Sequence, residues 1–429
     1  MMQRLRRREM RLPVFLSILT IVAITPIASA CEMCRGAGAD LHRLPLPSSS
    51  VGGGVVVSGG GGPLSVPALS SRPGARAKLY LDFDGDFSTS WGSYSPGTTP
   101  AYTTDADATT FTSSELITID HIWQGVAEKF SPFDLDVTTV DPGALNEQQG
   151  YRLVVGGTGS WYGLAGGVAY LGGFSSDSAP NTAFVFSANL LPADPLHASF
   201  VTAASAHEAG HGFSLTHQSK WNGNQYVEEY NRGDAFKAPI MGSSYRKRGI
   251  WWRGPTFSPT VIQDDLITLS DLDINGFGYR SDDHANTADA ATPLSQDAGI
   301  WSATGVIEQR TDVDYFSFDF TGGMVNFVLA VAPYEAMLDA AMSLYNLSGD
   351  LILSRDTATL GESFMAELPA GSYRLAVTSH RSYGDIGQFS LTGIVAIPEP
   401  GVLGASCLTF AALAGRRWVR SGSKNRPIN

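Results

Sequence analysis

Three histidines and a glutamate lie within residues 207–217 at spacings that suit a metal ion. His207 and His211 are four residues apart, so on a helix both imidazoles lie on one face and can reach the same ion. His217 can supply a third nitrogen from the turn after that helix. Three protein nitrogens with a fourth position open to water are typical of catalytic zinc sites. Because Glu208 can accept a proton from that water, the pattern predicts a hydrolase in which water is the nucleophile.

A bare His-Glu-x-x-His sequence also occurs by chance, on helices whose histidines are structural or solvated. This chain contains only 8 histidines in 429 residues. Three of them at these spacings therefore favour a zinc site over a chance match.

The same segment resembles the signature of the metzincin zinc peptidases, His-Glu-x-x-His-x-x-Gly-x-x-His followed by a methionine-containing turn under the metal. His207, Glu208, His211 and His217 match the four chemical positions, and Met241 matches the methionine. The resemblance implies an α+β catalytic domain in which a five-stranded mixed sheet accompanies an active-site helix. It also implies Zn²⁺ held by the three histidines, with Glu208 as the catalytic base.

Two positions depart from the metzincin pattern. Ser214 stands where the family usually has glycine, and the positive φ of a sharp turn there costs serine about 1 kcal/mol. In some members a tyrosine lies two residues after the methionine, a place taken here by Ser243. Tyr245 lies four residues after the methionine and is a candidate substrate-binding residue.

Residues 163–173 are rich in glycine. In the resembled fold, the fourth strand is an edge strand that pairs with an extended peptide substrate through backbone hydrogen bonds. Gly167 and Ala169 are therefore candidate substrate-binding residues, because small residues leave room for a second chain. A glycine-rich connector between two strands explains the segment equally well.

The segments before the motif show an order of elements that suits this fold. Thr112 and Glu115 have the spacing of a capping box, which predicts a helix that ends before Pro132. A second helix is expected over residues 196–212. Short apolar or alternating runs predict strands over residues 77–83, 135–140, 151–155, 167–171 and 182–186.

Composition divides the chain into five parts. Residues 1–30 have the basic start, apolar stretch and small-residue end of a secretory signal peptide. Residues 31–75 are expected to be a Gly/Ser/Pro-rich linker or short propeptide. Residues 76–282 form the expected catalytic domain. Two further segments follow it, residues 283–395 and 396–429.

The two C-terminal parts have distinct patterns. Residues 283–395 contain short alternating runs separated by turn signals, which predict an all-β antiparallel sandwich. Within it, residues 311–318 and 368–375 resemble the bacterial pre-peptidase C-terminal domain, which implies an accessory role without catalysis. Residues 396–429 combine Pro-Glu-Pro, an apolar run and arginines. They resemble the PEP-CTERM sorting signal of Gram-negative bacteria, and a plain membrane anchor is the alternative.

Charge narrows the possible partners. The chain carries 29 Lys plus Arg against 41 Asp plus Glu, and ten of the basic residues lie in the two end segments. This balance argues against nucleic acid or an anionic membrane as a partner. Acidity also leaves Ca²⁺ open as a second cofactor. Residues 82–86 resemble the start of a calcium loop, but Ser93 stands where an EF-hand needs glutamate, so a polar turn is favoured.

These patterns together predict a zinc-dependent endopeptidase, exported through the Sec pathway to the envelope or exterior of a Gram-negative bacterium. Its expected partners are a protein or peptide substrate and, transiently, the membrane sorting machinery. Two alternatives stay open. One is a zinc hydrolase with a non-peptide substrate, and the other is a surface-binding module with a degenerate site.

Overall fold

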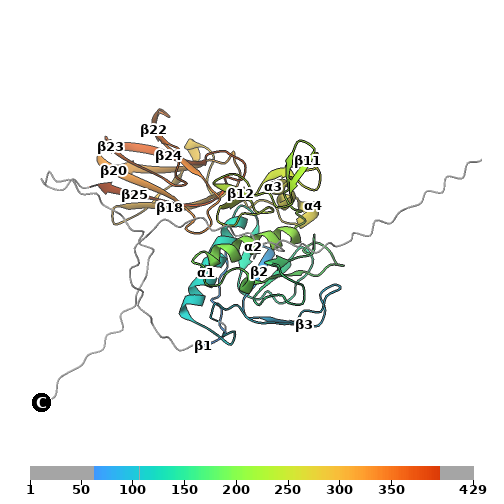
Figure 1. Ribbon diagram of the computed structural model, residues 1–429. Coiled ribbons are helices and arrows are strands. Elements are labelled where there is room, and N and C mark those ends of the chain that lie inside the picture. Colours follow the sequence, from blue (N-terminus) through green and yellow to red (C-terminus); the bar gives the residue numbers. More distant parts are fainter. Residues whose placement is uncertain (1–61, 106, 397–429) are drawn as a thin grey trace, which may run out of the picture.

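The computed structural model describes residues 62–105 and 107–396 (Figure 1). The predicted signal peptide, most of the predicted linker and the predicted sorting tail lie outside these residues. Within them, none of the helices is long and apolar enough to cross a membrane. Strands dominate and helices are few, with one mixed five-stranded sheet followed by two sheets of a sandwich.

A mixed sheet forms the base of the N-terminal unit, with strand order β6-β2-β7-β9-β8. Four of its strands run parallel and β8 runs antiparallel to β9 at the edge. The five strands are β2 (Ala77–Asp82), β6 (Leu135–Thr138), β7 (Gly150–Val155), β8 (Gly167–Val168) and β9 (Thr182–Val185). The predicted five-stranded mixed sheet is therefore confirmed.

The edge strand β8 is shorter than the predicted strand over residues 167–171. The chain turns after Val168 because Gly172, at φ +70°, directs its N–H to the carbonyl of His211 at 2.8 Å. Glycine adopts this left-handed conformation without steric cost. A bond to the helix that carries His207 and His211 has thus replaced continued strand pairing.

Two long helices pack against each other and against the sheet (Figure 1). Helix α1 (Ser113–Phe130) begins with the predicted capping box, in which Thr112 and Glu115 bond to each other's backbone N–H groups. Helix α2 (His197–Gly212) is buried along nearly its whole length and rich in alanine. A helix that is buried on all sides needs such small residues for close packing, so its position in the core agrees with its composition.

Residues 64–75, expected to belong to a linker, lie against the N-terminal unit. Leu64 and Val66 pack on its hydrophobic core. The hydroxyl of Ser70 donates to Asp136 at 2.8 Å, and Arg72 forms an ion pair with Asp134 at 2.6 Å. Side-chain bonds to β6 and its flank therefore order this polar segment.

Short strands and helices on both sides of α2 in the sequence complete the N-terminal unit. Three two-stranded pairings and two short helices follow the third histidine: β10 (Lys220–Asn222) with β11 (Gln225–Glu228), β12 (Lys237–Pro239) with β13 (Arg248–Ile250), β14 (Arg253–Pro255) with β15 (Ile262–Asp264), α3 (Asp265–Ser270) and α4 (Leu272–Asn275). Earlier come the pairs β1 (Gly62–Pro63) with β5 (Thr110–Phe111) and β3 (Asp86–Ser88) with β4 (Gly97–Thr99), and the 3₁₀ turn η1 (Ser187–Asn189).

The turn at residues 82–86 is polar, as favoured from the sequence. Arg152 on β7 forms ion pairs with Asp82 and with Asp86, the latter at 2.9 Å. Burial raises the pKa of Asp82 to about 7, and the guanidinium of Arg152 opposes that rise. An arginine therefore compensates the carboxylates that resembled a calcium loop.

The C-terminal part is a sandwich of two five-stranded sheets. One has the order β16 (Thr292–Pro293), β19 (Asp314–Phe320), β24 (Gly371–Ser379), β21 (Ala340–Asn346) and β22 (Leu351–Arg355). The other has the order β17 (Ser295–Asp297), β18 (Ile300–Ile307), β25 (Gly387–Ala396), β20 (Gly323–Val331) and β23 (Glu362–Leu368). The 3₁₀ turn η2 (Ala288–Ala290) leads into it. Pairing is antiparallel except between β16 and β19.

Each part has a hydrophobic core. The sandwich core contains rings such as Trp301, Phe316 and Phe327 between its sheets. The core of the N-terminal unit includes two sandwich residues, Met337 and Ile386, which are both fully buried. The two parts therefore share apolar packing at their junction.

Candidate metal centre

The three predicted ligands meet at one point. The Nε2 atom of His211 lies 3.0 Å from Nε2 of His207 and 3.2 Å from Nε2 of His217. Helix α2 supplies the first two, and the chain reverses direction after Phe213 to supply the third. In a tetrahedral site with Zn–N bonds of about 2.0–2.1 Å, ligand nitrogens stand about 3.3 Å apart, so the spacing fits zinc.

The other nitrogen of each imidazole faces an oxygen. Nδ1 of His207 lies 2.7 Å from the Ile240 carbonyl, and Nδ1 of His211 lies 2.7 Å from the Leu215 carbonyl. Nδ1 of His217 lies 2.8 Å from a carboxylate oxygen of Glu229. Oxygens of these kinds accept hydrogen bonds, so each Nδ1 carries the proton and donates it.

This arrangement leaves the Nε2 lone pairs of neutral imidazoles facing one another. Burial, and then the neighbouring histidines, lower the pKa of His207 and of His211 well below the usual range, which favours the neutral form. Three converging lone pairs repel unless a cation lies between them. These three residues could therefore hold a cation through nitrogen ligands of the kind that zinc prefers.

Glu208 follows His207 on α2 and is fully buried. Neither of its carboxylate oxygens has a hydrogen-bond partner among the described residues, and burial raises the pKa of its carboxyl well above the usual range. Gly167 of β8 packs directly on it, since a Cβ atom at residue 167 would stand 2.7 Å from Cγ of Glu208. The edge strand and the carboxylate therefore fit together only because residue 167 has no side chain.

Met241 is fully buried and lies against the metal-binding helix. A Cβ atom at Gly210 would stand 2.4 Å from its Sδ atom, which places the thioether between the levels of His207 and His211. The Met241 carbonyl accepts the N–H of Gln218 at 2.8 Å. The methionine turn thus connects the first two ligands to the residue after the third.

A network of amides and one carboxylate holds the segment of the third ligand. Asp265 is fully buried and accepts hydrogen bonds from the side chains of Gln218 and Gln263 at 2.8 and 2.9 Å. The side-chain oxygen of Gln263 accepts hydrogen bonds from the backbone N–H and from the hydroxyl of Thr216. Residues on both sides of His217 are therefore fixed to the start of α3.

The three residues predicted to bind substrate have different surroundings in the structure. Ala169 is fully buried and follows the two-residue strand, so its side chain faces the core. Tyr245 is half-buried, and its ring packs edge-on against Phe200 at 5.7 Å. Of the three substrate-binding candidates, Gly167 is the one that contacts Glu208.

One residue close to the third ligand was missed as a site residue, and an aromatic ring lies beside it. Glu229 bonds to Nδ1 of His217, and the ring of Tyr230 lies 4.5 Å from the His217 ring and 6.3 Å from the His207 ring. Glu228 and Glu229 are adjacent, and the sequence gives no sign of which one turns toward the histidine. The register of the β10–β11 hairpin decides it.

Comparisons with known proteins add little to this geometry. No family model matches the chain, and no curated protein matches it. Among solved structures, the pre-peptidase C-terminal domain of a Bacillus anthracis collagenase matches 24% of this chain and 93% of its own, at 11% identity and a TM-score of 0.20. A periplasmic inhibitor of g-type lysozyme from Aeromonas hydrophila matches 24% and 94%, at 16% identity and a TM-score of 0.20. TM-scores this low do not establish a shared fold.

Replacing Ser214 tests the strain in the turn after α2. Ser214 has φ +72°, in the left-handed region, as its place in the motif suggested. Ser214→Gly should raise the free energy of unfolding by about 0.5–1 kcal/mol, because glycine adopts this conformation freely. Denaturant titration measures the change. Ser131→Gly, at φ −55°, is the matched control and should lower stability. A destabilised Ser214→Gly variant would contradict the argument.

Replacing Glu229 tests its support of His217. Glu229→Gln should weaken zinc binding about tenfold, since carboxylates that orient ligand histidines typically contribute at least that much. Competition with a chromophoric chelator measures the affinity. Glu228→Gln is the control, because Glu228 pairs with Lys220 and Arg232. Equal effects of the two substitutions would exclude a specific role for Glu229.

Proposed function

We propose that this protein is an exported zinc endopeptidase of the metzincin type. The convergence of three imidazole lone pairs beside a buried, unpartnered carboxylate is the observation that supports it best. Zinc bound there would lower the pKa of a coordinated water and polarise the scissile carbonyl. The helix, sheet and methionine turn around the site agree with the resemblance in the motif.

Glu208 is the proposed general base. It follows His207 directly on α2, and its carboxylate faces Gly167 of the edge strand β8. It would take a proton from the attacking water and return it to the leaving amine. A raised pKa suits both steps, because the group must bind the proton and release it again within one cycle.

An extended peptide would bind along β8. This strand is at the edge of the sheet, it runs antiparallel to β9, and Gly167 brings its backbone next to Glu208. Backbone pairing with such an edge is a common way to hold peptides, and it would bring the scissile bond to the water. This placement favours a peptide over a non-peptide substrate. A module that only binds surfaces has no need for Glu208 in this position.

The composition and the predicted end segments support export to the envelope or exterior of a Gram-negative bacterium. We propose protein or peptide substrates and, transiently, sorting machinery as partners, without nucleic acid.

We also propose a calcium site where the sandwich begins. Asp314 is fully buried, and neither carboxylate oxygen has a hydrogen-bond partner among the described residues. Candidate ligand atoms of Asp283 and His284 lie within 4.8 Å of it, and Asp282, Glu308 and Asp312 form a second such group. Arg280 forms ion pairs at 3.4 Å with Asp283 and with Glu308. One arginine cannot neutralise all the carboxylates of these two groups. Calcium prefers carboxylate oxygens as ligands.

The peptidase proposal predicts a loss of activity without a loss of metal. Glu208→Gln should lower cleavage of an unfolded protein by at least about a hundredfold, the usual contribution of a general base. Zinc content should stay at one equivalent, and a chelator should abolish the wild-type activity. Glu367→Gln, on the exposed face of β23, is the control. Undiminished cleavage by Glu208→Gln would overturn the proposal, and cleavage of other bonds alone would favour the non-peptide alternative.

The calcium proposal predicts a pH-dependent stabilisation. Burial raises the pKa of Asp314 and of Glu308 to about 9, so the metal-free sandwich gains stability as pH falls from 9 toward the usual carboxyl range. Calcium binds the ionised groups, so its effect has the opposite sign. With zinc in excess, calcium should raise Tm clearly at pH 9 and little at pH 5, and Asp314→Asn should abolish the rise. An unchanged Tm on addition of calcium at pH 9 would refute the calcium site.

A further inference from the structure

Two loops of the sandwich enter the N-terminal unit. Residues 332–339 carry Met337 and residues 380–386 carry Ile386, the two fully buried side chains in the other unit's core. The second loop lies so close to β13 that a Cβ atom at Gly384 would stand 2.5 Å from the carbonyl oxygen of Trp251. The sandwich is therefore packed into the N-terminal unit through these loops.

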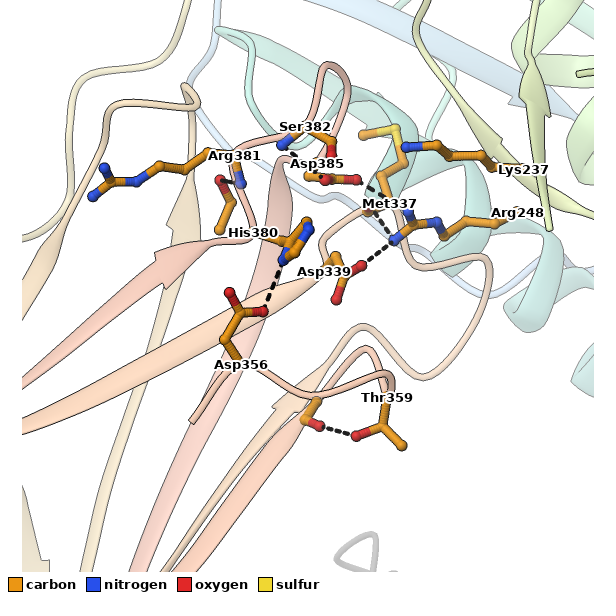
Figure 2. Close-up of polar contacts among 12 residues, drawn as sticks. Lys237, Arg248, Met337, Asp339, Asp356, Thr359, His380, Arg381, Ser382 and Asp385 are labelled. Carbon is orange, nitrogen blue, oxygen red and sulfur yellow. Dashed lines mark hydrogen bonds and ion pairs between the residues drawn. The ribbon is translucent and has the colours of Figure 1, made fainter. Parts of the chain in front are cut away.

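Arg248 on β13 is the ionic centre of this junction, as Figure 2 shows. Its guanidinium lies 3.0 Å from Asp385 and 3.6 Å from Asp339, both on the sandwich loops. It also donates to the carbonyl of Met337 at 3.5 Å. Asp385 is fully buried, so its charge depends on this arginine.

Helix α1 meets the same loops through two buried charges. Glu128 accepts hydrogen bonds from the backbone N–H groups of Met337 and Gln388 at 3.0 and 3.1 Å. Lys129 donates to the carbonyl of Glu335 at 2.5 Å and to that of Gly249 at 2.8 Å. The sandwich therefore supplies partners that these buried groups require.

One chain of contacts leads from the junction to the first metal ligand. Arg248 begins β13, whose last residue, Ile250, accepts the N–H of Ile240 at 3.0 Å. The carbonyl of Ile240 orients His207 at 2.7 Å. The strand that carries the junction arginine thus also positions the carbonyl that fixes this imidazole.

A second chain leads to the third ligand. The hydroxyl of Tyr383, in the loop 380–386, donates to Asp264 and accepts the N–H of Leu266 at 3.1 Å. Between these two residues lies Asp265, which holds Gln218, the residue after His217. Loop 380–386 therefore contacts, through Asp385 and Tyr383, the segments that position His207 and His217.

We propose that loop 380–386 of the sandwich is a positioning element of the metal centre. The Arg248–Asp385 ion pair and the Tyr383–Asp264 hydrogen bond hold the segments that orient His207 and His217. Their loss weakens metal binding although no ligand is changed. This inference rests on the proposed metal site and is independent of whether the substrate is a peptide.

The test uses the full chain with Arg248→Met and, as a milder change, Tyr383→Phe. Zinc affinity is measured by chelator competition at a temperature where every variant is folded by circular dichroism. The visible absorption of the Co²⁺-loaded protein reports the ligand geometry. Each variant should bind zinc about tenfold more weakly and show shifted cobalt bands, in line with other groups that support ligands indirectly. Arg248→Lys, which retains the charge, should recover part of the affinity.

Asp356→Asn is the matched control. Asp356 pairs with the half-exposed His380 at 2.8 Å (Figure 2), and it takes part in neither the Arg248–Asp385 ion pair nor the Tyr383–Asp264 hydrogen bond. It should change neither the affinity nor the spectrum. A lower Tm with unchanged affinity and unchanged cobalt bands in Arg248→Met and Tyr383→Phe would show that the junction is merely structural, and would overturn the inference. Failure of the wild-type protein to bind zinc would instead overturn the proposed metal site itself.

Discussion

The structure depends on one electrostatic constraint, the meeting of three imidazole Nε2 lone pairs in a buried place. Neutral rings with this orientation are stable only if every Nδ1–H is held by an oxygen and a cation lies between the Nε2 atoms. The surrounding elements supply those oxygens from different parts of the chain: the carbonyl of Ile240, the carbonyl of Leu215 and the carboxylate of Glu229. Much of the fold after α2 therefore serves to bring acceptors behind the imidazoles.

Burial costs free energy for several ionisable groups around the three histidines. Burial raises the pKa of Glu128 and of Asp265 to about 7, so ionised forms of both are disfavoured and depend on their hydrogen-bond donors. Removing one partner of a buried charge typically costs about 3–5 kcal/mol. Each such group therefore makes alternative arrangements of its neighbours unfavourable. For Asp265 those neighbours flank His217, and for Glu128 they are the loops of the sandwich.

The sequence predicted what local patterns determine. The capping box at Thr112 fixed where α1 begins, and the spacing of His207 and His211 required one helix face. The two-residue length of β8 could not be predicted, because it follows from the bond between Gly172 and His211, residues far apart in the chain. Glu229 was missed for a related reason, since only the hairpin register turns it toward His217.

The geometry of an imidazole explains where the sandwich contacts the N-terminal unit. Nδ1 and Nε2 lie on different sides of the ring, so groups that orient a ligand through Nδ1 must approach from behind the metal. In the proposed peptidase, water and substrate would approach from the side of Glu208 and β8. The Nδ1 partner of His207 follows β12, which pairs with β13, and the start of α3 holds the residue after His217. The sandwich loops meet those elements through Arg248 and Tyr383. A second domain thus contacts the segments that hold the Nδ1 partner of His207 and the residue after His217.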